Sequence, residues 1–194
     1  MLENLINLDH KLFLLLNGGG SPFLDNIMLA VSSHWFWVPV YLFLLVYFIR
    51  ANGIKGLIEI GIIFLTLLIT DQTSVHLFKE VFERLRPCHD PMIMDQMKLV
   101  AESCGGQFGF VSSHATNSFG LMIVSAGLIR KRPYTIFILM WALLLSYSRI
   151  YIGVHYPGDI LGGMILGLLL GGIVLSIYKP IRKKLSENAR TKKT

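Results

Sequence analysis

Residues 160–177 read ILGGMILGLLLGGIVLSI, a stretch of 18 residues without a charged side chain. A helix needs roughly 20 mostly apolar residues to cross the ~30 Å hydrocarbon core of a bilayer. Four further stretches are nearly free of charge, and each reaches that length once its flanks are counted. We therefore predict an all-α integral membrane protein with a bundle of about five transmembrane helices. The other four stretches are residues 35–49, 57–69, 119–129 and 134–147.

The composition agrees with a membrane protein. Of the 194 residues, 53% are hydrophobic and 15% are charged, whereas about a quarter of a soluble domain is charged. The formal net charge is +6. Because the cations sort by predicted membrane side and not onto one soluble face, we expect no nucleic-acid partner. The chain starts with acidic residues and has no basic n-region, so no cleavable signal peptide is expected.

The first 33 residues differ from the rest of the chain. Leu5, Leu8, Leu12 and Leu15 recur at helical spacing, and GGGSP at residues 18–22 then interrupts the pattern. We expect two short amphipathic helices that lie in the membrane interface. The predicted divisions are interfacial helices at 1–33, a transmembrane core at 34–178 and a basic tail at 179–194.

The distribution of Lys and Arg predicts the orientation. Twelve of the 18 fall on one predicted side, in the first connection (Arg50, Lys55), the RKRP turn at 130–133 and the C-terminal tail. The positive-inside rule makes this side cytoplasmic. We expect a multi-pass protein of a bacterial cytoplasmic membrane with a cytoplasmic C-terminus. The six remaining cations gather on the external side: Lys11, Lys79, Arg84, Arg86, Lys98 and Arg149.

Two of these external cations lie in KEVFERLRP, residues 79–87, at the end of the second predicted span. If the helix persists to Arg86, Lys79 and Arg86 are about two turns apart and share a face. Pro87 disfavours helix at Arg86, so the guanidinium would lie at the helix end. Two cations that snorkel to the interface are the alternative interpretation.

The segment GFVSSHATNSFG, residues 109–120, places two serines and a histidine at the start of an apolar helix. The first turn of a helix leaves backbone N–H groups unpaired, and these groups and the Ser112 hydroxyl could bind an anion. Helix capping alone would explain Ser112 or Ser113. Capping does not require His114, which would stand one turn inside the site.

The segment SRIYIGVHYPGD, residues 148–159, places Arg149 and His155 before a turn at Pro157. Asp159 would fall in the first turn of the next helix, where it could accept a hydrogen bond from His155 and orient the imidazole as a nucleophile. Charge compensation at the helix N-terminus is the alternative for Asp159. Together the segments predict phosphoryl transfer, which needs in-line positioning and cations on the phosphate oxygens.

These three segments together resemble the signature of the type 2 phosphatidic acid phosphatase superfamily, which also contains vanadium haloperoxidases. KEVFERLRP fits Lys, six residues, Arg-Pro; VSSH is similar to a Pro-Ser-Gly-His box; SRIYIGVHYPGD fits Ser-Arg, five residues, His, three residues, Asp. The resemblance spans roughly residues 20–178. Val111 replaces the proline of the box, and Ser113 replaces its glycine, which matters if that position needs a positive φ.

The resemblance implies a phosphatase that forms a phosphohistidine and needs no metal or other cofactor. His155 would be the nucleophile, Asp159 would orient it, and His114 would be the general acid. The substrate would be a lipid phosphate held at headgroup depth, on the periplasmic or exterior side of the bilayer. The phosphate would be bound by Lys79, Arg86, Ser112, Ser113 and Arg149.

Three lipids are candidate substrates by resemblance: undecaprenyl diphosphate, phosphatidylglycerophosphate and a lipid A phosphate. Two other classes of protein could share parts of this signature. A soluble haloperoxidase is incompatible with five spans in a chain of this length. A non-catalytic protein that binds or transports lipid headgroups would keep the cations, but it would not need His155, Asp159 and His114 together.

Cys88 and Cys104, the two cysteines of the chain, fall in the predicted external loop. On an oxidising face they are expected to form a disulfide that ties the two ends of this loop together. A zinc site made of Cys88, His89, Cys104 and His114 is the competing interpretation.

Gly163, Gly167 and Gly171 recur at intervals of four residues in the last predicted span. Small residues at this spacing let helices approach closely. We expect them to pack within the bundle, and a homodimer seam is the alternative.

Overall fold

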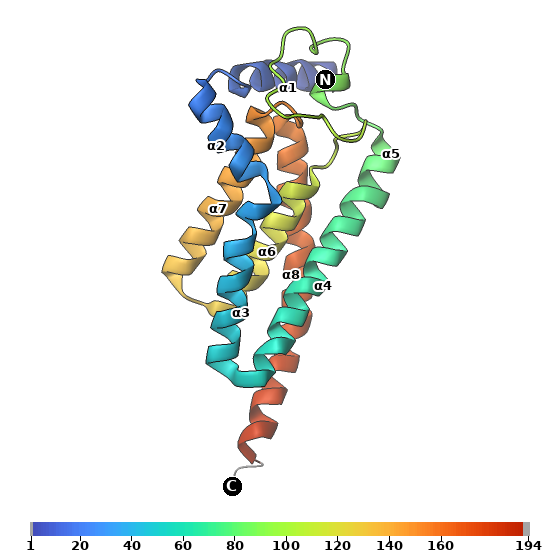
Figure 1. Cartoon of the computed structure of the whole chain (residues 1–194). Helices are drawn as coiled ribbons and strands as arrows, with labels where there is room; N and C mark the ends of the chain where they lie inside the picture. Colours follow the sequence, from blue (N-terminus) through green and yellow to red (C-terminus); the bar gives the residue numbers. More distant parts are fainter. Residues whose placement is uncertain (1, 192–194) are drawn as a thin grey trace.

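The computed structural model describes the backbone of residues 2–191 and the side chains of residues 3–184. These residues form helices and connecting loops, with one isolated bridge between Leu85 and Phe108. The predicted all-α class is therefore confirmed. Figure 1 shows an elongated bundle, with α1 lying across the end opposite the C-terminus.

The bundle is built from long helices in an up-and-down arrangement (Figure 1). Three stretches are long and apolar enough to cross a membrane: His34–Phe82, Arg132–Tyr151 and Pro157–Lys184, which contain 18-residue windows with a mean hydropathy of 1.9, 1.3 and 2.5. The first stretch holds two helices joined by a turn at Gly53, whose φ of 58° suits glycine. The five crossings therefore stay a prediction. The helices are α3 (Val38–Asn52), α4 (Gly56–Gln72), α6 (Ser113–Ile129), α7 (Arg132–Tyr151) and α8 (Pro157–Thr191).

The N-terminal segment forms two helices, α1 (Leu2–Leu16) and α2 (Pro22–Ser32), as the sequence predicts. The apolar side chains of Leu5, Leu8 and Leu12 on α1 are exposed. An exposed apolar stripe on a helix that crosses the end of the bundle suits a position in the membrane interface. That position stays a prediction.

The end of the second predicted span differs from expectation. The α-helical backbone of α4 gives way to a π-helix at Thr73–Lys79, and the short α5 (Glu80–Phe82) follows. Glu83 has a φ of 48°, which ends the helix, and Arg86 lies in extended backbone. The predicted helical face shared by Lys79 and Arg86 is therefore wrong, because Arg86 reaches its place from a loop.

The glycines of α8 allow α6 to pack closely against this helix. A Cβ on Gly163 would stand 2.7 Å from the Ser112 carbonyl oxygen of α6. One on Gly167 would collide with the Thr116 carbonyl oxygen, and one on Gly171 would also meet α6 backbone. The glycine face thus packs inside the bundle, as the first of the two interpretations predicts, and α6 occupies the surface that the dimer alternative would use.

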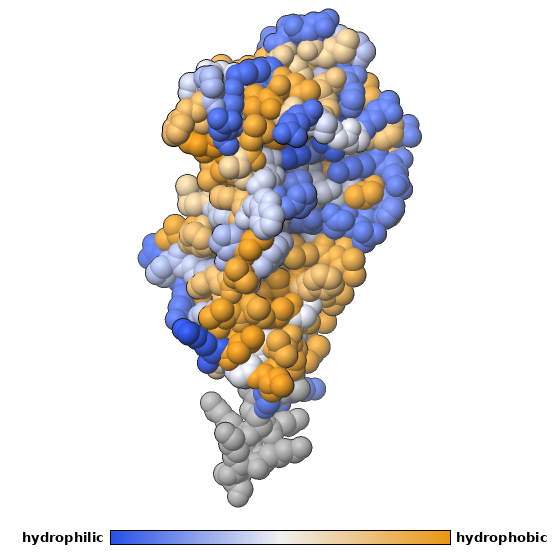
Figure 2. All heavy atoms as spheres, viewed as in Figure 1, coloured by the Kyte–Doolittle hydropathy of each residue, from blue (hydrophilic) through white to orange (hydrophobic). Residues whose placement is uncertain are grey.

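Polar and apolar residues separate along the bundle. Figure 2 shows hydrophobic residues covering much of its lower part, and hydrophilic residues gathering toward the end that carries α1. Arg50, Lys55 and the turn at 130–132 lie near the opposite end, where the C-terminus also lies (Figure 1). Helix α8 continues through the predicted boundary at residue 178 as far as Thr191.

We predict that Gly167→Ala lowers the free energy of unfolding by about 1–3 kcal/mol, because the methyl group overpacks the α6–α8 contact. Gly172→Ala is the matched control: beyond its own helix turn, no atom of the described residues lies within 4 Å of its Cβ position, and alanine favours helix by up to about 1 kcal/mol. Denaturant titrations of both variants in detergent micelles check the difference. Equal stability of the two variants would contradict the packing assignment.

Candidate active site

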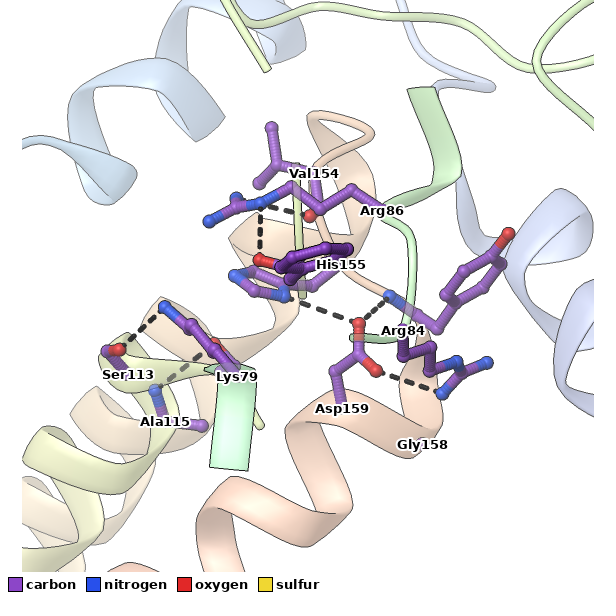
Figure 3. Close-up of polar contacts among 12 residues, drawn as sticks. Lys79, Arg84, Arg86, Ser113, Ala115, Val154, His155, Gly158 and Asp159 are labelled. Atoms are coloured by element: carbon purple, nitrogen blue, oxygen red, sulfur yellow. Dashed lines mark hydrogen bonds and ion pairs between the residues drawn. The ribbon is translucent and has the colours of Figure 1, made fainter. Parts of the chain in front are cut away.

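The residues predicted from the three segments meet at the end of the bundle beneath α1. Figure 3 shows Lys79, Arg86, Ser113 and His155 around one region, with Asp159 on the side of the imidazole that is away from Ser113. They come from the second span, the loop after it, the start of α6 and the turn between α7 and α8. Residues distant in the sequence therefore converge as the motif resemblance implies.

The imidazole of His155 is held by Asp159. His155 follows the end of α7 and is 1% exposed. Its Nδ1 lies 3.3 Å from Oδ2 of Asp159, in the first turn of α8, and the backbone N–H of Tyr156 donates to the same oxygen at 3.0 Å. Burial and then the positive charge of Arg86 lower the pKa of His155 well below its ordinary value. The ring is therefore neutral at neutral pH, with Nε2 available for chemistry.

Two cations are fixed beside this ring by hydrogen bonds. The Arg86 side chain donates from Nε to the Phe108 carbonyl at 3.2 Å and from Nη1 to the Val154 carbonyl at 3.4 Å. Lys79 donates from Nζ to Oγ of Ser113 at 2.8 Å. Their positions are thus set by neighbouring backbone and by α6 before any ligand binds.

Arg149 is a third cation, in the last turn of α7. Its Nη1 donates to Oγ of Ser32 in α2. Its Nε is buried and has no hydrogen-bond partner among the described residues. A buried donor without a partner carries a desolvation cost that an anionic ligand would remove. Arg149 is therefore suited to bind an anion here.

The start of α6 uses its two serines differently. Ser112 is the N-cap, and its Oγ accepts from the Ala115 N–H at 3.5 Å, so the hydroxyl serves the helix. The Oγ of Ser113 lies 2.7 Å from that of Ser74 and also accepts from Lys79. Ser113 has helical backbone without a positive φ, so the family's glycine is not required at this position. Its amide, in the first turn, is left to bind an anion.

His114 lies between this polar cluster and a cavity that has both apolar and polar lining residues, Asp71 and Asn117 among the polar ones. The half-buried ring is 6.4 Å from those of His34 and Trp37, measured between centroids. It lines a cavity of about 360 Å³ between α3, α4 and α6, with Trp37, Phe64 and Leu68 among the other lining residues. A proton donor here could serve a group that extends into apolar surroundings.

Three contributors were not predicted. Arg84 donates from Nη1 to Oδ1 of Asp159 at 2.9 Å and from Nη2 to Oδ2 of Asp9 at 2.6 Å. A Cβ on Gly109 would stand 3.0 Å from Oδ2 of Asp159 and 3.2 Å from Cγ of Arg86. Arg84 and Gly109 sit within and beside the quoted motifs, but spacing alone assigns them no role. Nothing in the local sequence singles out Asp9.

The external loop is crosslinked in the structure. Cys88 and Cys104 are joined as a disulfide, with Cα atoms 6.3 Å apart. Ligand atoms of Cys88, His89 and Cys104 also lie within 4.8 Å of one another. His114 is not part of this cluster; it lies in α6 beside His34 and Trp37. The arrangement favours the disulfide over the four-residue zinc site.

Comparison with known proteins places the chain among membrane phosphatases. A family model described as the PAP2 superfamily matches residues 60–183. Lipid A 4'-phosphatases of Porphyromonas gingivalis and Bacteroides thetaiotaomicron are 37% and 38% identical, over 94% and 97% of this chain and 78% and 84% of theirs. The crystal structure of a transmembrane PAP2-type phosphatidylglycerolphosphate phosphatase from Bacillus subtilis is 26% identical, with a TM-score of 0.67 over 92% of this chain and 88% of that one.

We predict that neither cysteine reacts with an alkylating reagent in unreduced, denatured protein, because both thiols are consumed in the bridge. Mass spectrometry before and after reduction measures this. Reduction should lower the stability by up to roughly 3 kcal/mol, the value for a loop of about this length. Two alkylated cysteines in unreduced protein, or one tightly bound zinc per chain, would contradict the bridge.

Proposed function

The chain belongs to the PAP2 superfamily and is a membrane lipid phosphatase, and we propose that it removes the 4′-phosphate of lipid A through a phosphohistidine on His155, without a metal. The observation that carries the chemistry is the buried His155–Asp159 pair, with the charges of Lys79, Arg86 and Arg149 close enough to act on His155. The choice of lipid rests on the two relatives named lipid A 4'-phosphatase, which match nearly the whole chain. Undecaprenyl diphosphate and phosphatidylglycerophosphate are the competing substrates.

The first step is attack of His155 on phosphorus. Asp159 accepts a hydrogen bond from the Nδ1–H group of His155, so the lone pair of the ring is on Nε2. The carboxylate also stabilises the positive charge that the ring gains during attack. As the Nε2–P bond forms, the bond between phosphorus and the lipid oxygen breaks. Because the fold already holds the imidazole in one orientation, much of the entropic cost of aligning the nucleophile is removed from the reaction step.

Preorganised cations stabilise the charge on the transferring phosphoryl group. Lys79, Arg86 and Arg149 can contact its oxygens, together with the first-turn amide of Ser113. Arg149 contributes a buried Nε that has no other partner among the described residues. Three cations supply the charge neutralisation that divalent metals provide in other phosphoryl-transfer sites, which supports a metal-free reaction.

In this mechanism His114 acts on the leaving group. It would donate a proton to the departing lipid oxygen, and the cavity beside it would receive the part of the lipid next to that oxygen. In the second step a water attacks phosphorus and breaks the Nε2–P bond, and His114 accepts a proton from that water. The products are the lipid alcohol and inorganic phosphate.

We also propose that the site faces the periplasm or exterior. Arg50, Lys55 and the cations of the 130–132 turn lie near the end opposite α1 (Figure 1). By the positive-inside rule that end is cytoplasmic. The disulfide in the external loop agrees with an oxidising compartment on the side of the site.

A protein that only binds or transports lipid headgroups could use the same cations. The buried His155–Asp159 hydrogen bond favours catalysis, because headgroup binding needs no oriented neutral imidazole. Loss of turnover with retained anion binding in a His155 variant separates the two functions.

We predict that detergent-solubilised protein releases phosphate from lipid A in excess chelator, and more slowly from undecaprenyl diphosphate or phosphatidylglycerophosphate. Orthovanadate should inhibit. His155→Ala should lower kcat by at least about 10⁴-fold, as loss of a covalent nucleophile does. His76→Ala is the matched control, because His76 is exposed and its ion pair among residues 3–184 is with Glu80. Malachite-green assays and mass spectrometry of the lipid measure rate and position.

Each part of the proposal has its own contradicting result. Turnover that requires an added metal overturns the metal-free chemistry. Retained activity in His155→Ala overturns the nucleophile. Faster hydrolysis of another lipid in the panel, or loss of a phosphate other than the 4′ group, overturns the substrate.

We predict that Gly109→Ala lowers kcat by about 10–100-fold, because its methyl group would displace Asp159 or Arg86 and small displacements of reacting groups are costly. Gly106→Ala, in the same loop, is the control, since no described residue apart from its chain neighbours lies within 4 Å of its Cβ position. The ratio of the two kcat values under identical conditions measures the effect. Similar activity in both variants would show that the close approach at Gly109 has no catalytic consequence.

A further inference from the structure

A chain of polar contacts runs from the buried carboxylate of Asp159 to the N-terminal helix. Arg84 contacts Oδ1 of Asp159 through Nη1 at 2.9 Å and Oδ2 of Asp9 through Nη2 at 2.6 Å. The other Asp9 oxygen accepts from the Gly158 N–H at 2.8 Å. Figure 3 shows Arg84 on the side of Asp159 that faces away from Lys79. Helix α1 therefore contacts the start of α8 through Asp9, both directly and through Arg84.

The two oxygens of Asp159 have separate partners. Oδ2 accepts from the Tyr156 N–H and faces Nδ1 of His155. Oδ1 is bonded to Arg84. A carboxylate rotates about one bond, so a contact on Oδ1 also fixes where Oδ2 points. The orientation of His155 thus depends on Arg84, which is too far along the chain to be part of the His155 turn.

Asp9 is itself held in place by its surroundings. The neighbouring His10 ring stacks on that of Tyr156 with centroids 5.1 Å apart, and its Nε2 lies 3.5 Å from an oxygen of Asp90. The same oxygen of Asp90 accepts from the Tyr156 hydroxyl at 2.8 Å. The Arg84 guanidinium lies 4.3 Å from the centroid of the Tyr156 ring. These contacts fix α1 against the turn that carries His155.

The energetic effect of these contacts depends on how deeply their charged side chains are buried. The Asp159 side chain is fully buried, and those of Asp9 and Arg84 are 14% and 26% exposed. Burial lowers the pKa of Arg84, but the carboxylates of Asp159 and Asp9 more than offset this and raise the pKa overall. Removing one member of such a partly buried set leaves the other charges without a partner.

We propose that Asp9 and Arg84 are positioning residues for the phosphatase reaction, through which the interfacial helix α1 holds Asp159, and hence His155, in the attacking orientation. This inference rests on the proposed nucleophilic role of His155. Neither residue contacts the reacting phosphoryl group. Their effect is on the rate of attack and not on the affinity for the phosphate.

The test compares Arg84→Gln, Arg84→Lys and Asp9→Asn in the full-length detergent-solubilised protein, with lipid A as substrate. Arg84→Gln should lower kcat by about 10–100-fold and leave KM and the inhibition constant of inorganic phosphate within about threefold. Arg84→Lys should recover part of the loss, because one ammonium group can reach one of the two carboxylates. Asp9→Asn should lower kcat less, and should have no further effect in the Arg84→Gln background, because both act through one contact chain.

Lys98→Gln is the matched control. Lys98 and Asp25 form an ion pair of 2.6 Å that also joins the N-terminal segment to the external loop, but it does not reach Asp159. Its kcat should be unchanged. Size-exclusion profiles and thermal midpoints of all variants report folding, and if Arg84→Gln does not fold, the kcat of the milder Asp9→Asn decides.

Three results would overturn the positioning role. They are an unchanged kcat in the folded Arg84 and Asp9 variants, additive losses in the double variant, and a loss confined to KM or to phosphate inhibition. The last would make Arg84 a direct phosphate ligand. His155→Ala in the same assay distinguishes the two levels of the argument: if it remains active, the proposed chemistry fails; if it is inactive while Arg84→Gln is not impaired, only the positioning role fails.

Discussion

Asp159 is the residue on which the site depends, because three separate parts of the chain bond to it. Its side chain meets His155, the Tyr156 N–H and Arg84, and its backbone carbonyl accepts from the Ser112 N–H at 3.0 Å. The turn before α8, the loop after the second span and the start of α6 are thereby placed relative to one another. A buried charge is tolerated only with such partners, so the fold and the orientation of the imidazole are determined together.

The second constraint on the site is its excess of positive side chains over nearby carboxylates. The charges of Lys79, Arg86 and Arg149 all act on a neutral His155, and Arg149 keeps a buried Nε without a partner among the described residues. Repulsion among these cations weakens the empty site, and an anion with several oxygens relieves it. The same preorganisation that costs stability therefore favours phosphate binding and stabilises charge that develops during transfer.

Local sequence predicted those parts of the structure that depend on composition or on short spacing. The apolar runs indicated the helical bundle, and His155 and Asp159 are four residues apart, so a single turn brings them together. The change to π-helix at Thr73–Lys79 and the left-handed Glu83 could not be predicted, because the sequence there continues to favour helix. Arg86 consequently enters from a loop, although the motif that contains it was recognised.

Contacts between segments that are distant in the sequence could not be predicted from local sequence either. Asp9 and Arg84 are 75 residues apart, and so are Arg84 and Asp159. Each is an ordinary charged residue in its local sequence, one on the polar side of an amphipathic helix and one among several cations. Only the placement of α1 across the end of the bundle joins them. The requirement for glycine at position 109 could not be predicted either. A Cβ there would approach Asp159 and Arg86, which come from elsewhere in the chain.

The packing glycines of α8 connect the membrane-embedded part of the fold to the chemistry at its end. Gly163 lets the backbone of α6 approach α8 at the Ser112 carbonyl, next to the point where the Ser112 N–H bonds to Asp159. The N-termini of α6 and α8 are therefore adjacent, and the positive ends of two helix dipoles lie near one site. A larger side chain at Gly163 would push α6 away and separate Ser113 and His114 from His155. A stripe of small residues that serves only packing in most membrane helices thus sets the distance between the anion-binding helix end and the nucleophile.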